Sequence, residues 1–210
     1  MKTDLKKKSR NPEKTRTHIL EAAFDEIYRQ GFQGVSIDKI VEQTRVTKGA
    51  FYHHFPTKNN LGYAIVDESL REMILDRWIR PLAAYKNPVR GILKRFKKLT
   101  KDWSDEHLAF GCPLNNLTQE MSAIDPMFRE KLQNVMAMWI DETEKYLKKA
   151  QTDGQLKKSV NTRQLAEFIV AVQESAFAMT KTMNDRRMLD SLYNSLKDYL
   201  ESKCEDSLSP

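Results

Sequence analysis

Proline marks the start of one helical stretch after another in this chain, and few other residues interrupt the backbone. Pro88, Pro113 and Pro126 each begin a stretch whose apolar side chains recur every three or four residues. Proline is tolerated at the first helical position because the N–H that it lacks would be unpaired there anyway. With only 7 glycines and 7 prolines in 210 residues, the chain lacks the closely spaced turns of a many-stranded sandwich or barrel. We therefore expect an all-α fold.

Helical spacing of apolar residues continues along most of the sequence, and nothing in it resembles a strand longer than four residues. Gly31 ends the first expected helix, since glycine readily adopts the left-handed backbone that follows a helix. Pro56 interrupts the pattern once, and Thr57 can cap the long helix after it. We expect about nine helices on this spacing. They cover about residues 15–30, 37–43, 48–55, 57–85, 88–107, 113–124, 126–152, 162–183 and 186–203.

Composition excludes several other classes of protein. Hydrophobic residues make up 40% and charged residues 30% of the chain, so a packed core is expected and wholesale disorder is not. The two cysteines, Cys112 and Cys204, belong to no CxxC or Cys/His cluster, which argues against a disulfide framework or a zinc site. The longest apolar run, from Phe168 to Val172, is too short to span a membrane. We expect a cytoplasmic protein without metal, cofactor or membrane partner.

Positive charge is concentrated near the N-terminus. Residues 1–60 hold 12 Lys and Arg against 7 Asp and Glu, whereas the remaining residues hold 23 against 22. Such asymmetry favours a polyanion as the partner of the N-terminal part, although a solvated basic tail would give the same count. We expect a flexible basic tail over residues 1–12.

A pair of short helices follows the first one and has clear start signals. Ser36 and Thr47 are typical N-cap residues, and Thr44-Arg45-Val46 separates the two helices. Val35 with Ile40, and Val46 with Phe51, have the spacing of a hydrophobic staple. Two capped helices joined by a short turn, with a longer helix before them, predict a helix-turn-helix unit over residues 13–60. Its second helix would enter the major groove of DNA.

The helix expected over residues 48–55 has two different faces. Phe51 and Phe55 lie four residues apart and share the side that should pack inward. Tyr52 and His53 point outward, and Lys48 stands at the N-terminus, where free N–H groups favour a phosphate. Gly49 costs about 1 kcal/mol relative to alanine inside a helix. Either the close approach of DNA or tight packing against the preceding helix would explain it.

These residues together resemble a known family. The segments GFQGVSIDKI (residues 31–40) and VTKGAFYHHFPTK (residues 46–58) are similar to the tetracycline-repressor (TetR) family of bacterial transcription regulators. The resemblance covers about residues 13–60. It implies a homodimeric repressor that binds a palindromic DNA operator and is released by a small-molecule effector. Pro56 departs from the family pattern, which often has a polar or basic residue there, and its presence could remove one backbone contact.

The resemblance also assigns roles to individual residues. Phosphate contacts position a protein on DNA, whereas contacts to base edges provide sequence preference. Of the eight residues listed below, Lys48, Gly49 and His53 would meet bases or the DNA backbone, and the other five would meet phosphates. The implied DNA-binding residues are Ser36, Thr47, Lys48, Gly49, Tyr52, His53, His54 and Lys58.

The resemblance makes residues 61–210 a ligand-binding and dimerisation domain. Large apolar side chains there could line an effector pocket or simply form the core. The apolar stripes of the last two helices fit a four-helix bundle across a two-fold axis, and packing within one chain is the alternative. The pocket candidates are Trp103, Phe110, Cys112, Trp139, Phe168 and Phe177. The dimer candidates are Val172, Ala176, Met179, Leu189, Leu192 and Leu196.

Cys112 precedes Pro113 and is therefore an expected N-cap. A helix N-terminus lowers the pKa of a thiol and favours the reactive thiolate. The segment FGCPL (residues 110–114) also resembles a Gly-Cys stretch in a branch of the family that includes sensors of reactive electrophiles. A thiol-based sensor is therefore one alternative function, and a buried, inert cysteine is the other interpretation of this residue.

Two further classes of function remain to be weighed. An enzyme is not expected, because the sequence has no phosphate-binding loop, metal cluster or GxSxG motif. A nucleoid-type protein that reads only DNA shape would share the basic N-terminal part. A footprint with discrete contacts on a palindrome would separate a regulator from such a protein.

Overall fold

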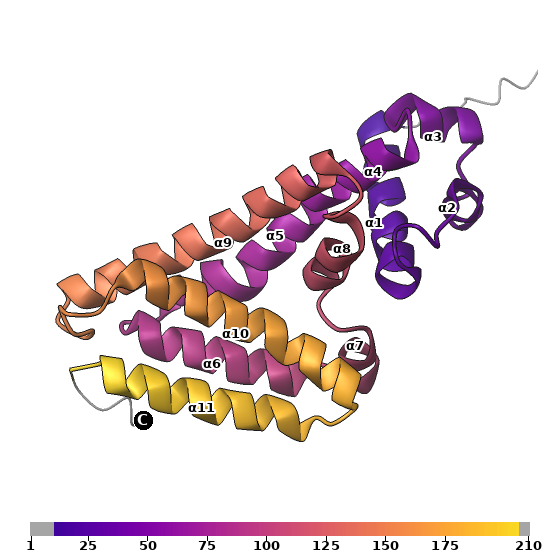
Figure 1. Ribbon diagram of the computed structural model, residues 1–210. Coiled ribbons are helices and arrows are strands. Elements are labelled where there is room, and N and C mark those ends of the chain that lie inside the picture. Colours follow the sequence, from indigo (N-terminus) through magenta and orange to yellow (C-terminus); the bar gives the residue numbers. More distant parts are fainter. Residues whose placement is uncertain (1–10, 206–210) are drawn as a thin grey trace, which may run out of the picture. The chain divides into compact units, whose positions relative to one another are not determined.

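The structure is a computed structural model that describes residues 11–205, and the chain divides after Ile65 into two compact units. Its regular structure is helical, apart from an isolated antiparallel bridge between Leu156 and Cys204 (Figure 1). The expected basic tail falls largely on residues 1–10, which lie outside the described residues. Within the described chain, no helix is long and apolar enough to cross a membrane.

The N-terminal unit begins with a three-helix arrangement whose start signals are the expected ones. Ser36 Oγ accepts a hydrogen bond from Lys39 N at 3.2 Å, and Thr47 Oγ1 accepts one from Ala50 N at 3.1 Å. The first helix starts earlier than expected, because Asn11 caps it and Pro12 occupies its first position. The helices are α1 (Pro12–Gln30), α2 (Ile37–Thr44), α3 (Lys48–His54) and α4 (Lys58–Ala64).

A small core and one buried acid fix these helices. The staple residues Val35 and Ile40 are buried, as are Phe51 and Phe55 on the inner side of α3. In addition, Glu26 of α1 lies with its Oε2 2.7 Å from Lys39 Nζ and accepts a hydrogen bond from Gln43. The Lys39 contact lowers the pKa of the Glu26 carboxyl. Glu26 therefore joins α1 to α2 through an ion pair.

Helices also make up the C-terminal unit, in which α10 packs against α9 and α11. The core includes Leu82, Val89, Leu147, Ile169 and Leu196. In Figure 1, α6, α10 and α11 run side by side. The elements are η1 (Ile65–Leu70), α5 (Arg71–Ile74), η2 (Leu75–Ile79), η3 (Arg80–Ala84), α6 (Pro88–Asp102), α7 (Asp105–Phe110), α8 (Pro113–Met121), α9 (Pro126–Thr152), α10 (Thr162–Met183) and α11 (Arg187–Lys203).

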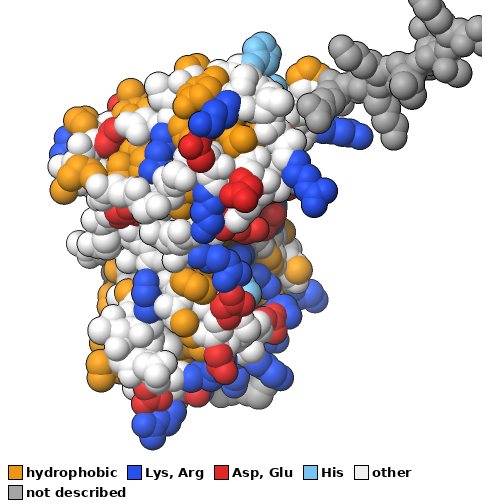
Figure 2. All heavy atoms as spheres, turned by 90° about the vertical axis from the view of Figure 1, so that its right-hand side faces the viewer, with side chains coloured by type: hydrophobic (Ala, Val, Ile, Leu, Met, Phe, Trp, Pro, Cys, Tyr) orange, Lys and Arg blue, Asp and Glu red, His pale blue; other side chains and the backbone are white. Residues whose placement is uncertain are grey.

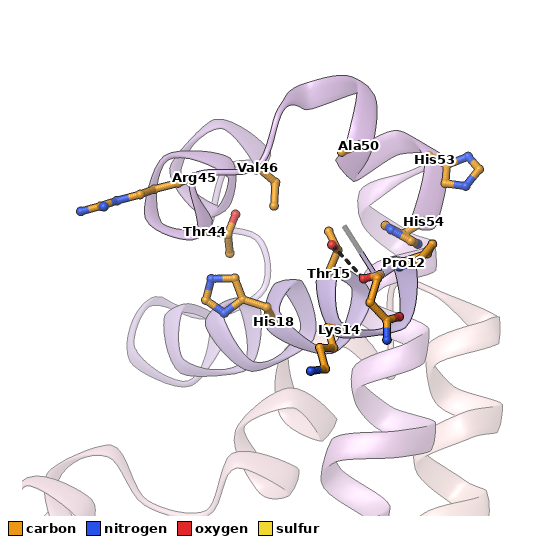
Figure 3. A pocket seen from close by; sticks show the side chains of 11 residues that line it. Pro12, Lys14, Thr15, His18, Thr44, Arg45, Val46, Ala50, His53 and His54 are labelled. Atoms are coloured by element: carbon orange, nitrogen blue, oxygen red, sulfur yellow. Dashed lines mark hydrogen bonds between the residues drawn. The ribbon is translucent and has the colours of Figure 1, made fainter. Parts of the chain in front are cut away.

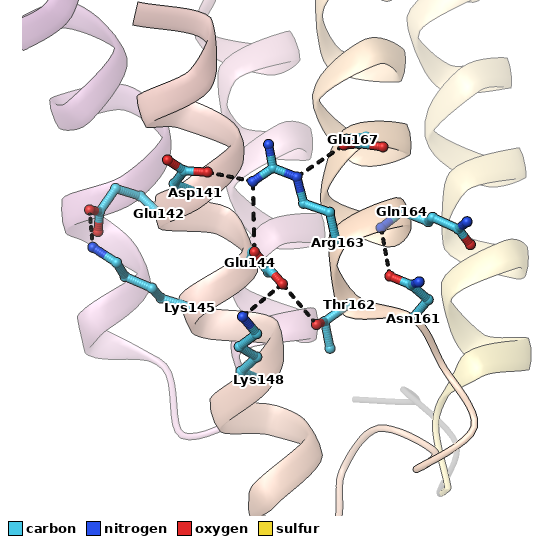
Figure 4. Close-up of polar contacts among 10 residues, drawn as sticks. All are labelled: Asp141, Glu142, Glu144, Lys145, Lys148, Asn161, Thr162, Arg163, Gln164 and Glu167. Carbon is cyan, nitrogen blue, oxygen red and sulfur yellow. Dashed lines mark hydrogen bonds and ion pairs between the residues drawn. The ribbon is translucent and has the colours of Figure 1, made fainter. Parts of the chain in front are cut away.

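A polar network joins the beginning of α10 to α9 (Figure 4). Arg163 forms ion pairs with Asp141 of α9 and with Glu167, one turn further along α10. Glu144 accepts a hydrogen bond from Thr162 at 3.2 Å and pairs with Lys148 at 2.8 Å. These contacts fix the register of two helices that otherwise meet through apolar side chains.

Two of the expected helices differ in detail. The helix expected over residues 88–107 is divided into α6 and α7, because Trp103 is extended and Ser104 caps the second helix through His107 N at 3.2 Å. The long helix after Thr57 is helical from residue 58 to residue 84, but η1 and η2 are π-helical. In η2, Arg77 O accepts hydrogen bonds from Arg95 Nε and Nη2 at 2.9 and 2.7 Å.

Candidate nucleic-acid interface and effector cavity

One side of α3 is buried and the other is exposed, as the angles of its side chains predict. Phe51 and Phe55 are buried, whereas Tyr52 is 46% exposed and His53 is exposed with it. His54 is half-buried. The outer surface of α3 therefore presents hydrogen-bonding groups, and their contact with DNA stays a prediction.

Among residues 11–205, none packs so closely against position 49 that a glycine is required there. A Cβ atom built on Gly49 would have Thr47 Oγ1, at 4.0 Å, as its nearest neighbour. Tight packing against the preceding helix is therefore the wrong explanation for this residue. By contrast, a Cβ on Gly34 would lie 2.5 Å from Gln30 O, so that glycine is needed by the fold. Gly49 leaves a bare strip of backbone on the outer side of α3.

The two lysines expected to meet phosphates have partners within the chain. Lys48 Nζ lies 2.8 Å from Asp38 Oδ1, and this contact raises the pKa of the lysine. Lys58 Nζ donates to Gln33 O at 3.3 Å and lies 4.8 Å from the centre of the Phe32 ring. Figure 2 shows Lys and Arg side chains among acidic and apolar ones on the face it presents. A phosphate would thus have to compete with local partners.

An open groove of about 510 Å³ lies between the beginning of α1, the turn before α3 and α3 itself (Figure 3). None of the described residues that line it is acidic. Of its basic residues, only His53 and His54 were singled out from the sequence. Sequence reasoning did not select Lys14 and His18 of α1 or Arg45 of the turn before α3. The available signal was the four-residue spacing of Lys14 and His18, which places both on one face of α1. The groove is lined by Asn11, Pro12, Lys14, Thr15, His18, Thr44, Arg45, Val46, Ala50, His53 and His54.

In the C-terminal unit, four of the six pocket candidates meet around one small cavity. The ring centres of Trp103 and Phe177 are 3.9 Å apart, and those of Trp78 and Trp139 are 5.5 Å apart. The cavity is about 10 Å³, which is room for one water at most. Its lining comprises Met73, Ile74, Arg77, Trp78, Leu99, Trp103, Cys112, Trp139, Glu174 and Phe177.

The other two candidates do not line this cavity. Phe110 is half-buried at the end of α7, where its carbonyl accepts a hydrogen bond from Asn116 Nδ2 at 2.7 Å. Phe168 is 41% exposed, and its ring centre lies 4.7 Å from that of Tyr199 on α11. Six residues at the cavity were not selected from the sequence: Met73, Ile74, Arg77, Trp78, Leu99 and Glu174.

Cys112 occupies the N-cap of α8 as expected, but the expected lowering of its thiol pKa is wrong. Burial raises the pKa of Cys112 well above its ordinary value, and the negative charge of Glu174 adds to this. The backbone groups of Leu114 and Asn115 act in the other direction with a smaller effect. Cys112 Sγ donates to Glu174 Oε1 at 3.3 Å. The thiol is therefore kept protonated.

The six dimer candidates divide into two groups. Ala176, Leu189 and Leu196 are buried within the chain, so for these three the alternative of intrachain packing is correct. Val172 and Leu192 are half-exposed, and Met179 is 43% exposed. The exposed faces of α10 and α11 also carry apolar and aromatic residues that were not selected for this role, among them Phe168, Ala171 and Tyr199.

The described residues contain no group of three or more His, Cys, Asp or Glu side chains that could hold a metal ion. The main feature of the N-terminal unit is the short helix α3, which is capped by Thr47 and has one exposed polar side. The helices α1 and α2 pack against it. This arrangement defines a helix-turn-helix protein, a class that places one helix in the major groove of DNA.

Comparison with known proteins identifies the family. A family model described as "Bacterial regulatory proteins, tetR family" matches residues 19–64, and one described as "Tetracyclin repressor-like, C-terminal domain" matches residues 89–196. The chain belongs to the TetR family of transcriptional regulators. Its relatives are regulators of transcription and not enzymes.

Two curated relatives and one solved structure illustrate the similarity. The chain is 29% identical to the transcriptional regulator AcuR of Cereibacter sphaeroides, over 78% of this chain and 74% of that protein. It is 25% identical to the transcriptional repressor DhaR of a Mycobacterium species, over 83% and 86%. A TetR-family regulator from Cytophaga hutchinsonii has the same fold, with a TM-score of 0.83, 21% identity, and coverage of 96% and 100%.

Proposed function

We propose that this regulator is a repressor that binds a palindromic operator as a homodimer and leaves it when a small molecule binds. The observation that supports DNA recognition best is the outer face of α3, where Tyr52 and His53 are exposed beside the open backbone of Gly49. The relative DhaR is a transcriptional repressor, which supports the repressor role. A DNA footprint with discrete contacts in two half-sites is expected, and a diffuse ladder would contradict this proposal.

Each protomer would use residues 13–60 to contact DNA and residues 61–210 to bind the effector and the second protomer. Within the first segment, Ser36, Thr47, Tyr52, His54 and Lys58 would meet phosphates. Lys48, Gly49 and His53 would meet bases or the backbone of the DNA. The proposed DNA contacts are Ser36, Thr47, Lys48, Gly49, Tyr52, His53, His54 and Lys58.

We expect Gly49→Ala to separate stability from DNA binding. The added methyl group enters open space in the free protein and removes the helical cost of glycine, so stability should rise by up to about 1 kcal/mol. On DNA the same methyl group would keep the backbone away, and operator affinity should fall at least about tenfold, or 1.4 kcal/mol. Thermal melting and operator titration measure the two effects.

Gly34→Ala is the matched control for this substitution. Its Cβ would lie 2.5 Å from Gln30 O, so we expect lower stability. A Gly49→Ala protein that melts earlier than the wild type would show that position 49 is packed, and full operator affinity would remove it from the interface.

Tyr52→Phe should weaken operator binding without destabilising the protein. The side chain is 46% exposed, and the change removes only the hydroxyl. A hydrogen bond to a charged phosphate contributes about 1.5–3 kcal/mol, so we expect operator affinity to fall by about 10- to 150-fold. Equal losses in binding and in thermal stability would mean that the hydroxyl supports the fold.

Dimerisation would use the exposed sides of the last two helices. Phe168, Ala171 and Met179 of α10, with Leu192 and Tyr199 of α11, leave an apolar surface in the single chain. In a two-fold symmetric pair the same surface covers itself. This supports the homodimer and assigns the buried Leu189 and Leu196 to the core beneath it.

Release by a small molecule would begin in the C-terminal unit, where Trp103, Cys112, Trp139 and Phe177 enclose a cavity. An effector shifts the protein away from DNA only if it binds the DNA-incompetent state more tightly. Operator must then weaken effector binding by the same factor. The raised pKa of Cys112 counts against the alternative of a thiol-based sensor, because the thiolate is the reactive form.

A further inference from the structure

Glu174 is an acidic residue in an unusual place. It lies on the side of α10 that faces the interior, with only 6% of its surface exposed. Its Oε1 accepts the hydrogen bond from Cys112 Sγ, whereas its Oε2 is buried and has no hydrogen-bond partner in the part of the chain that the structure describes. Leaving a buried acceptor unsatisfied costs roughly 1–3 kcal/mol, and more for a charged group. Such a group is expected to have a partner that comes from outside.

Aromatic rings line the same cavity as this carboxyl. Trp78 and Trp139 stack at 5.5 Å, and Phe177 lies 6.4 Å from Trp78 between ring centres. The face of an aromatic ring carries partial negative charge and attracts cations, above all when water is excluded. A carboxylate among such rings is therefore complementary to a positive group with apolar substituents.

Few other charges face this carboxyl. Cys112, at the start of α8, is one titratable neighbour. Arg77 of η2 also lines the cavity, with its guanidinium carbon 5.8 Å from the centre of the Trp103 ring. The side chains that α6, its C-cap and α9 contribute are uncharged: Leu99, Trp103 and Trp139. Burial raises the pKa of Glu174 to about 7, while the side chains of Cys112 and Asn115 limit the rise.

We propose that this cavity is the effector site and that its ligands are small organic cations, amines or quaternary ammonium compounds, held by the Glu174 carboxylate and the faces of Trp78, Trp139 and Phe177. This inference rests on the proposed function, because it names the chemical class of the effector. At about 10 Å³ the cavity is too small for such a ligand, so binding must move part of the wall.

Trp103 forms part of the cavity wall at a break in the helical structure. It stands in extended backbone between α6 and α7. Its carbonyl accepts a hydrogen bond from Arg186 Nη2 at 2.7 Å, and Arg186 also pairs with Asp105 at 2.9 Å. A cation that enters beside Glu174 would displace the indole from the Phe177 ring, whose centre lies 3.9 Å from its own, and tryptophan fluorescence would report the displacement.

Benzyltrimethylammonium and its neutral carbon isostere, neopentylbenzene, are suitable probes for the full-length protein. Titration followed by tryptophan fluorescence should show binding of the cation and at least tenfold weaker binding of the neutral compound. The cation prefers ionised Glu174, so its affinity should rise about tenfold from pH 6 to pH 8, as expected for a carboxyl that titrates near pH 7. Equal binding of both probes, or no binding of the cation, would overturn the proposal.

Two variants complete the experiment. Glu174→Gln keeps the shape, and it should lose both the preference for the cation and the pH dependence while remaining folded by thermal melting. Asp190→Asn removes an exposed acid of α11 and should change neither. Unchanged cation binding by Glu174→Gln, or its loss in Asp190→Asn, would contradict the assignment.

Operator binding is measured separately in the same samples. If the wild type binds no defined operator, the proposed function fails while the binding data on Glu174 still stand. If operator is bound and the cation is captured at Glu174 without releasing it, the cation is not the effector, and the assignment of the cavity as effector site is overturned.

Discussion

Replacing Ala171 and Met179 of α10 with glutamate in one variant should convert the proposed homodimer into monomers. Both positions are exposed in the single chain and lie on the apolar face that the dimer would cover. Each substitution places an unpaired carboxylate in that seam, which costs several kcal/mol per charge. A monomer has only one α3 for a site with two halves, so operator affinity should fall at least about 100-fold, or 2.7 kcal/mol.

Sedimentation at micromolar concentration and operator titration measure these two losses. Met127→Glu is the matched control, because Met127 is 44% exposed on α9 and Met179 is 43% exposed on α10. The control should remain dimeric with full affinity. A wild type that sediments as a monomer and still binds both half-sites tightly would refute the proposed interface.

Raising the salt concentration from 50 to 200 mM should weaken operator binding about 100-fold, if Lys48 and Lys58 of both protomers each neutralise one phosphate. Counterions released from DNA produce this dependence, with a slope of about −0.9 per phosphate in a double-logarithmic plot. Lys48→Ala should reduce the slope by about 1.8 for the dimer and blur sequence preference. Lys58→Ala should reduce it equally and weaken binding to all sequences alike.

A suitable control is Lys145→Ala. Lys145 resembles Lys48 because its side chain is 68% exposed, against 62% for Lys48, and both pair with a neighbouring acid. The control should keep the wild-type slope on operator and on random DNA. Salt-insensitive binding by the wild type would mean that neither lysine reaches a phosphate.

The parts of the fold that the sequence predicts are those governed by local chemistry. Ser36, Thr47 and Thr57 each cap the helix that follows, through a hydrogen bond three residues ahead. The break at Trp103 was missed because no glycine or proline marks it, and the only local signal is Ser104, which caps the helix after it. The stabilising contact there comes from Arg186, more than 80 residues away, and a local pattern cannot show such a contact.

The candidate sites show the same limit. An apolar stripe on α11 indicates that one side is covered, but Leu189 and Leu196 turn out to be covered by their own chain. Likewise, the helix end at Cys112 predicts a lowered thiol pKa, whereas burial against Glu174, which is 62 positions further along, raises it. In each case the decisive partner is distant in sequence.

The π-helical turns η1 and η2 have a consequence for changes in the length of the chain. A π turn closes its hydrogen bonds five residues back instead of four, so each turn accommodates one residue more than an α turn. Deleting a residue from η2 could restore plain α geometry there and leave the faces of the flanking segments in register. In α9, which is α-helical from Pro126 to Thr152, the same deletion would rotate every later side chain by about 100°. The helical segment from residue 58 to residue 84 thus contains two positions where a lost residue can be absorbed without turning a buried face toward solvent.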